Sequence, residues 1–404
     1  MPVSPKIDLI FIDSGGGHRA CALALQEVAR QQSRNWDLRL HSAQDILDPI
    51  DFIRKSTGVP FQDIYNHMLR HGWTLGTAQM IPAMHMIIRL LHREQVRMFA
   101  RHWSANQPDM VVSLIPHYNR AMRQALARVA PDVPFVTVMT DIADYPPHFW
   151  IERIDQYLIC GSEEAMGQAL AAGLPRERVL RASGMILHPR FYQPIEVDRA
   201  VERKRLGLRP DTPVGLVLFG GEGSTEIPKI ASLLDQSDLD IQLILLCGRH
   251  ERAAAEIRAL AKRIPMFIEG FTREVPRYMA LSDFFIGKPG PGSISEALAM
   301  RLPVIVERNA WTLAHERFNT YWLERQGVGI VTANFRQIAS AVRTLLEPAR
   351  FEAFRANAAT MRNHAVFEVV EMLEGILRTH PNGSLPAITN RPTHREPARV
   401  YSIN

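Results

Sequence analysis

No stretch of this 404-residue chain stays apolar over the roughly 18–20 residues that a membrane-spanning helix needs, so we expect no transmembrane segment. We also expect no signal peptide, because the N-terminus lacks a basic stretch followed by an apolar one. Cysteine is scarce, and Cys21, Cys160 and Cys247 lie far apart with no CxxC pair. This spacing excludes a disulfide framework and predicts reduced thiols in a cytoplasmic protein.

A zinc-protease signature is also missing. Residues 315–319 read His-Glu-Arg-Phe-Asn, which lacks the second histidine of an HExxH motif. Because that histidine is a zinc ligand, the sequence excludes this class, and we expect no metal.

Charge of one sign is only slightly in excess, with 47 Lys and Arg against 42 Asp and Glu, a net charge of +5. A content of 46% hydrophobic and 22% charged residues is typical of a soluble globular protein. Residues 54–101 hold seven basic and two acidic residues, a sum of +5, so the rest of the chain is neutral overall. The basic excess is therefore a local feature.

Short β-rich runs alternate with longer helical patterns in both halves of the chain, which is typical of parallel α/β domains. The strands are expected at residues 7–13, 38–41, 109–114, 135–141, 156–161, 179–182, 214–221, 241–248, 266–270, 284–288, 303–307 and 329–331. The pattern predicts two doubly wound, Rossmann-like domains, a linker between them, a C-terminal helix that packs back on the first domain, and a disordered tail. The two domains are expected at residues 1–185 and 214–360, with the linker at 186–213 between them. The C-terminal helix is expected at residues 361–378 and the tail at 379–404. The interdomain cleft is the expected ligand site, because open α/β sheets bind ligands at the carboxyl ends of their strands.

The first predicted strand runs into a glycine-rich loop, residues 13–20, with the sequence Asp-Ser-Gly-Gly-Gly-His-Arg-Ala. Glycines let the backbone turn tightly and approach a ligand, and the helix that follows offers free N–H groups. The loop fits neither the GxGxxG nor the Walker consensus. His18 is either a helix cap or a general base, since imidazole titrates near neutral pH.

Two further glycine loops follow strands in the second half. Residues 219–224 read Phe-Gly-Gly-Glu-Gly-Ser, a composition that suits a pyrophosphate bound by backbone amides and a hydroxyl. Residues 287–297 alternate Gly and Pro before a helix, in whose first turn we expect Glu296. Glu296 is either a cap favoured by the helix dipole or an acceptor for ribose hydroxyls.

Taken in order, these motifs resemble those of the monogalactosyldiacylglycerol synthases and the related bacterial diacylglycerol glycosyltransferases. More distantly, they are similar to the lipid-linked N-acetylglucosaminyltransferase of peptidoglycan synthesis. The resemblance runs over about residues 7–375, and its motifs are residues 13–22, 140–141, 184–194, 220–224, 247–249, 270–271, 288–298 and 316–319.

The resemblance implies a GT-B fold and inverting transfer of a hexose, galactose or glucose, from a UDP-sugar to a lipid, with diacylglycerol as the first choice. It implies no metal and no other cofactor. It makes His18 the first choice for the catalytic base and Asp141 the second, or the group that orients His18. Glu296 would hold the ribose, and Gly270 and Phe271 would border the uracil. His315, Glu316 and Asn319 would line the sugar side. The donor-binding residues that it implies are Gly221, Glu222, Gly223, Ser224, Arg249, Gly270, Phe271, Lys288, Gly290, Pro291, Gly292, Ser293, Glu296, His315, Glu316 and Asn319.

Two departures from the family pattern affect specificity. His315 stands where the family has Gln, at a position that touches sugar hydroxyls. The sequence therefore does not decide between galactose, glucose and other sugars of the donor. The family's His-Pro-Xaa-Trp cluster after the aspartate is displaced here, where residues 145–150 read Tyr-Pro-Pro-His-Phe-Trp. Cys21 replaces a family serine beside the first glycine loop.

The basic segment 54–101 also carries aromatic and methionine side chains, and from Arg89 onward arginine recurs every four residues. One interpretation is a helix packed on the sheet with a solvated basic edge. The other is an interfacial patch that places apolar residues among acyl chains and Arg on anionic headgroups. No nucleic-acid recognition motif accompanies the charge, so we expect no nucleic-acid partner. The residues assigned to the acceptor or the membrane are Gly16, Gly17, Trp73, Arg89, Arg93, Arg97 and Trp150.

The leading hypothesis is a peripheral enzyme on the inner face of the cell membrane, whose partners are a UDP-sugar, a lipid acceptor and an anionic membrane surface. The alternatives are a UDP-N-acetylglucosamine transferase or epimerase that acts on another substrate, and a non-catalytic sugar-nucleotide-binding subunit of a membrane complex.

Overall fold

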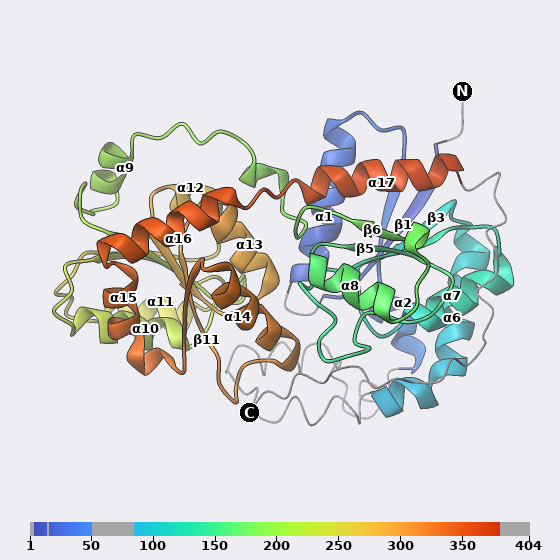
Figure 1. Ribbon diagram of the computed structural model, residues 1–404, viewed down its shortest axis with the longest axis horizontal. Helices are drawn as coiled ribbons and strands as arrows, with labels where there is room; N and C mark the ends of the chain where they lie inside the picture. The colour runs from blue at the N-terminus through green and yellow to red at the C-terminus, as the bar shows by residue number, and fades with distance from the viewer. Residues whose placement is uncertain (1–3, 14–15, 51–84, 380–404) are drawn as a thin grey trace.

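The computed structural model describes residues 4–13, 16–50 and 85–379. Within them the chain forms two parallel α/β domains that lie side by side (Figure 1). The strands of the first sheet lie in the order β2-β1-β3-β4-β5-β6. Their bounds are β1 Lys6–Phe11, β2 Asp37–Ser42, β3 Met110–Ser113, β4 Phe135–Val138, β5 Tyr157–Cys160 and β6 Val179–Arg181.

The strands of the second sheet lie in the order β12-β11-β10-β7-β8-β9, also in parallel. Their bounds are β7 Val214–Leu218, β8 Gln242–Leu246, β9 Met266–Glu269, β10 Phe284–Gly287, β11 Val304–Glu307 and β12 Gly329–Thr332. All strands are parallel, but the order in which the chain adds them to the sheet changes direction between β1 and β3 in the first domain and between β7 and β10 in the second. Ligands bind at such switch points, and the three predicted glycine loops follow β1, β7 and β10.

Helices cover both faces of each sheet. Their bounds are α1 Gly17–Gln31, α2 Ala43–Leu47, α6 His92–Asn106, α7 Asn119–Val129, α8 Glu163–Ala171, α9 Arg199–Arg205, α10 Glu226–Asp235, α11 Glu251–Arg258, α12 Val275–Ala280, α13 Pro291–Ala299, α14 Ala314–Gln326, α15 Ile338–Leu345, α16 Pro348–Thr360 and α17 Ala365–Thr379. Short 3-10 helices are η1 Asp48–Ile50, η2 Arg176–Arg178, η3 Pro189–Phe191 and η4 Phe335–Gln337. Among the described helices, none combines the length and the apolar character required to span a membrane.

Each predicted strand is present, but most of them end one to three residues earlier than the sequence indicates. The predictions 7–13, 135–141 and 214–221 include residues that lie beyond the carboxyl ends of β1, β4 and β7. Apolar residues continue past these strands because the loops at this edge are themselves packed, as Met139 at 2% exposure illustrates. Hydrophobicity alone therefore does not separate a strand from a buried loop.

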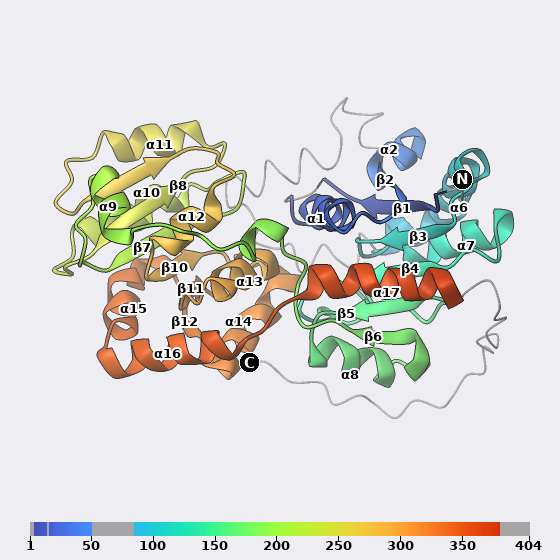
Figure 2. The ribbon, with the colours of Figure 1, turned by 90° about the horizontal axis from the view of Figure 1, so that it is seen from above.

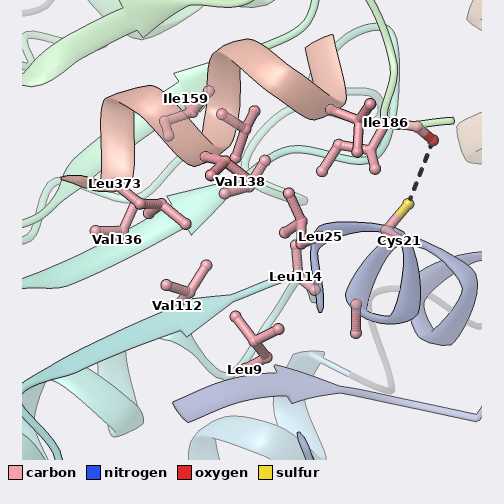
Figure 3. Packing of buried hydrophobic residues seen from close by; sticks show 14 of the residues in the cluster. Leu9, Cys21, Leu25, Val112, Leu114, Val136, Val138, Ile159, Ile186 and Leu373 are labelled. Atoms are coloured by element: carbon pink, nitrogen blue, oxygen red, sulfur yellow. Dashed lines mark hydrogen bonds between the residues drawn. The ribbon is translucent and has the colours of Figure 1, made fainter. Parts of the chain in front are cut away.

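The last helix packs on the first domain, although the helix before it belongs to the second (Figure 2). On α17, Val366, Val370 and Leu373 are buried against strand residues such as Leu9 and Val112 (Figure 3). Successive strand residues point to opposite faces, so the neighbouring Ile10 and Val111 pack against α6 and α7 instead.

Two chain crossings join the domains and are hydrogen-bonded to each other. The Asn363 side chain donates to the Met185 carbonyl at 2.9 Å, and the Ser183 amide donates to Glu368 at 2.6 Å. Between them, Gly184 leaves no room for a side chain, because a Cβ atom there would lie 2.5 Å from Asn363 Cγ. The linker and the start of α17 therefore form one connection.

Truncating Leu373 to alanine should destabilise the protein by about 2–5 kcal/mol, because Leu373 is fully packed in the core of the first domain. Urea unfolding followed by tryptophan fluorescence measures the loss. The matched control is Leu90→Ala, since Leu90 is 76% exposed and should change stability by about 0.5 kcal/mol or less. Equal effects of the two variants would contradict the packing of α17.

Candidate active site

Loops at the carboxyl ends of the two sheets meet across the cleft. The ring of Phe149 in the first domain stacks on that of His315 in the second, with centroids 5.4 Å apart and planes 11° apart. Tyr145 and Phe318 make a second ring contact at 6.3 Å. Figure 1 shows α13 and α14 on the side of the second domain that faces the first. Loops of both domains therefore meet at one place, which includes the predicted donor residue His315.

His18 lies in the first turn of α1, after Gly16, whose φ of 80° is the left-handed conformation that glycine tolerates. Its Nδ1 atom is 3.1 Å from the Thr140 hydroxyl oxygen. Burial lowers the pKa of His18 to about 4, opposed by a backbone hydrogen bond with Leu114 and reinforced by the nearby His315. The imidazole is therefore neutral at pH 7.

Asp141 follows β4 and is 6% exposed. Its Oδ2 atom accepts a hydrogen bond from the Trp150 indole N–H at 2.7 Å. Burial raises the pKa of Asp141, while His315 and the Trp150 hydrogen bond oppose the rise. Among the described residues, Asp141 is hydrogen-bonded to Trp150, and His18 is hydrogen-bonded to Thr140. Asp141 therefore does not orient His18, which was one of the two roles expected for it.

The loop that carries Trp150 is organised by Asp144, which sequence reasoning missed. One carboxylate oxygen of Asp144 accepts from the Trp150 amide at 2.6 Å, and the other accepts from the His148 amide at 2.9 Å. Asp144 is itself held through hydrogen bonds to the Gln168 side chain. An Asp before a Pro-Pro pair is a turn signal, but the sequence does not indicate which amides it will bind.

In the second domain the loops after β7 and β8 interlock. A Cβ atom at Gly223 would lie 2.1 Å from the Cys247 carbonyl oxygen, so only glycine fits there. The Arg249 guanidinium pairs with Glu222 at 3.0 Å and lies 4.2 Å from the Phe271 ring centroid. Arg249 and Phe271 thus border the same loop. The Ser224 side chain is 7% exposed, and its hydroxyl oxygen accepts a hydrogen bond from the Glu226 amide.

The third glycine loop is supported from behind by α14. Lys288 pairs with Glu316 at 3.2 Å, and the Asn319 side chain donates to the Pro289 carbonyl at 2.8 Å. Asn319 is fully buried, so it supports the loop and does not line the sugar side of the cleft. Glu316 and His315 lie in the first turn of α14, whereas residue 319 lies one turn further along and faces the interior.

Glu296 lies deeper in its helix than the sequence indicates. Because α13 begins at Pro291, Glu296 is its sixth residue and not part of the first turn, so the prediction that places it there as a cap is wrong. Burial raises the pKa of Glu296 to about 7, opposed by Arg190. The helix start itself, around Gly292 and Ser293, offers the free N–H groups.

The arginines of the basic segment lie on the surface beside exposed apolar side chains. Residues 85–90 are helical and precede α6, and Arg89, Arg93 and Arg97 are exposed. Met86, Ile87 and Leu90 are 62%, 56% and 76% exposed, so this helix does not bury its apolar residues on the sheet. Trp73 and the rest of residues 51–84 lie outside the described part of the chain, as do residues 380–404.

One group of potential metal ligands occurs among the described residues, away from the cleft. Asp8, His41 and His102 lie together between β1, β2 and α6. The Asp8 carboxylate already pairs with the Arg39 guanidinium, whose Nε donates at 2.7 Å. Arg39 neutralises the charge that a cation would need, so the group is explained as a buried ion pair.

Comparisons with known proteins place this architecture. Residues 216–370 match the glycosyltransferase family 28 C-terminal domain. Over 403 residues the chain is 27% identical to the chloroplastic monogalactosyldiacylglycerol synthase of Spinacia oleracea, covering 93% of this chain and 74% of the relative. Monogalactosyldiacylglycerol synthase 1 of Arabidopsis thaliana is 26% identical over 409 residues, covering 95% and 73%.

Two solved structures share the fold at low sequence identity. MurG of Acinetobacter baumannii aligns with a TM-score of 0.58 at 11% identity, covering 92% of this chain and 99% of that one. The UDP-GlcNAc 2-epimerase of Neisseria meningitidis aligns with a TM-score of 0.57 at 13% identity, covering 93% and 100%. The fold and the family match define the chain as a glycosyltransferase with the GT-B fold. Within that class it is a relative of the monogalactosyldiacylglycerol synthases, as the sequence motifs predict.

Replacing Glu296 by glutamine should stabilise the protein at high pH only. The native state keeps the proton on Glu296 up to about pH 7, whereas the unfolded chain releases it near the usual pKa of 4.5, so stability from this group falls as pH rises between these values. The melting temperature of Glu296→Gln should exceed that of the wild type by about 2–4 °C or more at pH 8 and match it near pH 4.5. The exposed Glu274→Gln is the control, and a gain independent of pH would contradict the burial of the charge.

Proposed function

We propose that the chain transfers galactose from UDP-galactose to the free hydroxyl of diacylglycerol, with inversion at the anomeric carbon. One observation carries this proposal. Two groups that can accept a proton, the buried Asp141 and the partly buried His18, lie where loops of the two domains meet, in a chain related to monogalactosyldiacylglycerol synthases over 93% of its length. UDP-glucose is the second donor to consider, because His315 replaces the family's Gln.

The second domain supplies the groups that would hold the donor. The free N–H groups at the start of α13, with Lys288 and Arg249 nearby in the cleft loops, would stabilise the charge that develops on the departing UDP. Glu296 would accept the ribose hydroxyls, and Phe271, 52% exposed, offers a ring face beside the uracil. The proposed mechanism needs no metal, since these groups supply the positive field.

Asp141 is the proposed proton acceptor. Burial lowers the pKa of His18 to about 4, which makes it a weaker base than an ordinary imidazole, whereas burial raises the pKa of the Asp141 carboxyl towards the working pH. As the acceptor oxygen attacks the anomeric carbon, its proton passes to Asp141. The bond between that carbon and the UDP oxygen breaks, and UDP leaves with the electron pair from the opposite face. In this scheme His18 would hydrogen-bond the acceptor hydroxyl before the transfer.

The lipid would reach the cleft from the exposed helix at residues 85–90. The first described residue of this helix, His85, is 3.2 Å from His117 in the loop after β3, so the helix borders the switch point of the first domain. Exposed apolar side chains beside a row of exposed arginines suit an anionic membrane surface. We therefore propose a peripheral location on the cytoplasmic face of a cell membrane.

A product assay tests the reaction. Purified protein is incubated with diacylglycerol liposomes and an equimolar mixture of UDP-galactose, UDP-glucose and UDP-N-acetylglucosamine, and the lipids are analysed by mass spectrometry with a standard for each hexose. We expect monogalactosyldiacylglycerol, and Asp141→Asn should lower kcat at least ~100-fold, while the exposed Asp132→Asn should not. Consumption of donor without a glycolipid would favour an epimerase and overturn the proposal.

Replacing Arg89, Arg93 and Arg97 together by alanine should weaken binding to anionic vesicles by about 100-fold at low salt, since each arginine contributes about 1 kcal/mol near such a surface. Co-sedimentation with phosphatidylglycerol-containing vesicles measures this effect, which should shrink as salt is raised. The control removes the same charge from the exposed Arg252, Arg258 and Arg355 of the second domain. If both triple variants bind like the wild type, residues 85–97 are only a solvated basic surface.

A further inference from the structure

The loop formed by residues 144–151 is folded around a single carboxylate. Asp144, itself 6% exposed, accepts hydrogen bonds from the amides of His148, Trp150 and Ile151 at 2.9, 2.6 and 3.4 Å. Three amides on one buried carboxylate leave this short segment little freedom at its carboxyl end. Gln168 on α8 fixes Asp144 from the other side. The position of Trp150 is therefore set by Asp144.

Trp150 transmits this order to Asp141. Its side chain is fully buried, and its indole N–H donates to Asp141 Oδ2 at 2.7 Å. A neutral donor at this distance stabilises the carboxylate but not the protonated acid at that oxygen, and it leaves Oδ1 for a proton from the cleft. The same loop presents Phe149 to His315 of the second domain.

We propose that Trp150, held by Asp144, is a positioning residue that keeps Asp141 ionised and orients its second oxygen into the cleft. This inference rests on the proposed role of Asp141 in the transfer and extends it to Asp144 and to Trp150, which the sequence assigned to the acceptor or the membrane but which is fully buried in the structure. It also gives a role to residues 145–150, which differ from the family's His-Pro-Xaa-Trp cluster. The path from Asp144 through Trp150 to Asp141 uses the indole of Trp150 and does not need the histidine and proline at the positions where the family has them.

Other ionisable groups face Asp141 from three sides. They are Cys21 on α1, Lys288 after β10, and His315 and Glu316 on α14. The ring of His18 also lies near that of Trp150, with ring centroids 6.0 Å apart. His315, the Trp150 hydrogen bond and Lys288 lower the pKa of Asp141, whereas Glu316 raises it. Removing the indole N–H should therefore raise this pKa further.

Infrared titration tests the proposal without donor or lipid. The C=O band of the protonated Asp141 carboxyl is assigned by its absence in Asp141→Asn, and its midpoint is measured in the wild type, Trp150→Phe and Asp144→Asn. We expect the midpoint to rise by about one pH unit or more in both variants, the size of one lost hydrogen bond to a carboxylate. Replacing Trp150 by benzothienylalanine, which keeps the ring shape without the N–H, gives the same test if phenylalanine leaves a cavity that disturbs folding.

The matched control is Trp103→Phe. Trp103 is also buried in the first domain, but its indole N–H has no hydrogen-bond partner among the described residues, so its replacement should leave the midpoint unchanged. An unchanged midpoint without the Trp150 N–H, or an equal shift in Trp103→Phe, overturns the role of Trp150. An unchanged midpoint in Asp144→Asn overturns the support by Asp144.

Kinetics separate this inference from the proposed function. If Asp141 is the base, the acid limb of the kcat profile of Trp150→Phe moves to higher pH with the infrared midpoint, and the deficit shrinks as pH rises. A shifted midpoint with wild-type activity in Asp141→Asn would confirm the Trp150 contact and refute Asp141 as the base. If Asp141→Asn is inactive but the kcat profile of Trp150→Phe superimposes on that of the wild type, Asp141 is supported as the base and the role of Trp150 is refuted.

Discussion

The candidate active site is divided between two domains, so its geometry depends on the connection that holds the domains together. This connection consists of two chain crossings, in which Asn363 binds the Met185 carbonyl and Glu368 binds the Ser183 amide. The burial of α17 in the core of the first domain anchors one side, and α16 remains on the second. Without that anchor the proton-accepting groups and the donor loops would lie on two independent bodies.

Desolvation at this interface sets the chemistry of the cleft. It lowers the pKa of His18 to about 4 and raises those of Asp141 and Glu296, so burial disfavours the charged form of each of these three groups. Several titratable groups with shifted pKa values in one place are typical of a functional site. The same desolvation makes a single indole N–H on Asp141 significant.

The relation to monogalactosyldiacylglycerol synthases accounts for the glycine loops, and the structure shows which contacts several of the loop residues make. Gly223 allows two loops to interlock, and Lys288 is held by Glu316. Asn319 belongs to a sugar-side motif in the sequence but supports the loop backbone in the structure. A motif thus combines residues that meet a ligand with residues that only shape the loop, and spacing does not distinguish them.

The sequence by itself determined the two α/β domains, the positions of the strands and the loops that border the cleft, because strand hydrophobicity and glycine placement are local properties. It did not determine the ends of the strands, since the loops beyond β1, β4 and β7 are packed as well. It placed Glu296 in the wrong turn, because the start of α13 depends on Pro291 and not on the charge pattern. Only the tertiary structure decided that Asp141 pairs with Trp150, that His18 pairs with Thr140, and that Asp144 folds the loop between the domains. Those partners are separated along the chain or joined through backbone amides, and they meet only when the sheets and their loops are assembled.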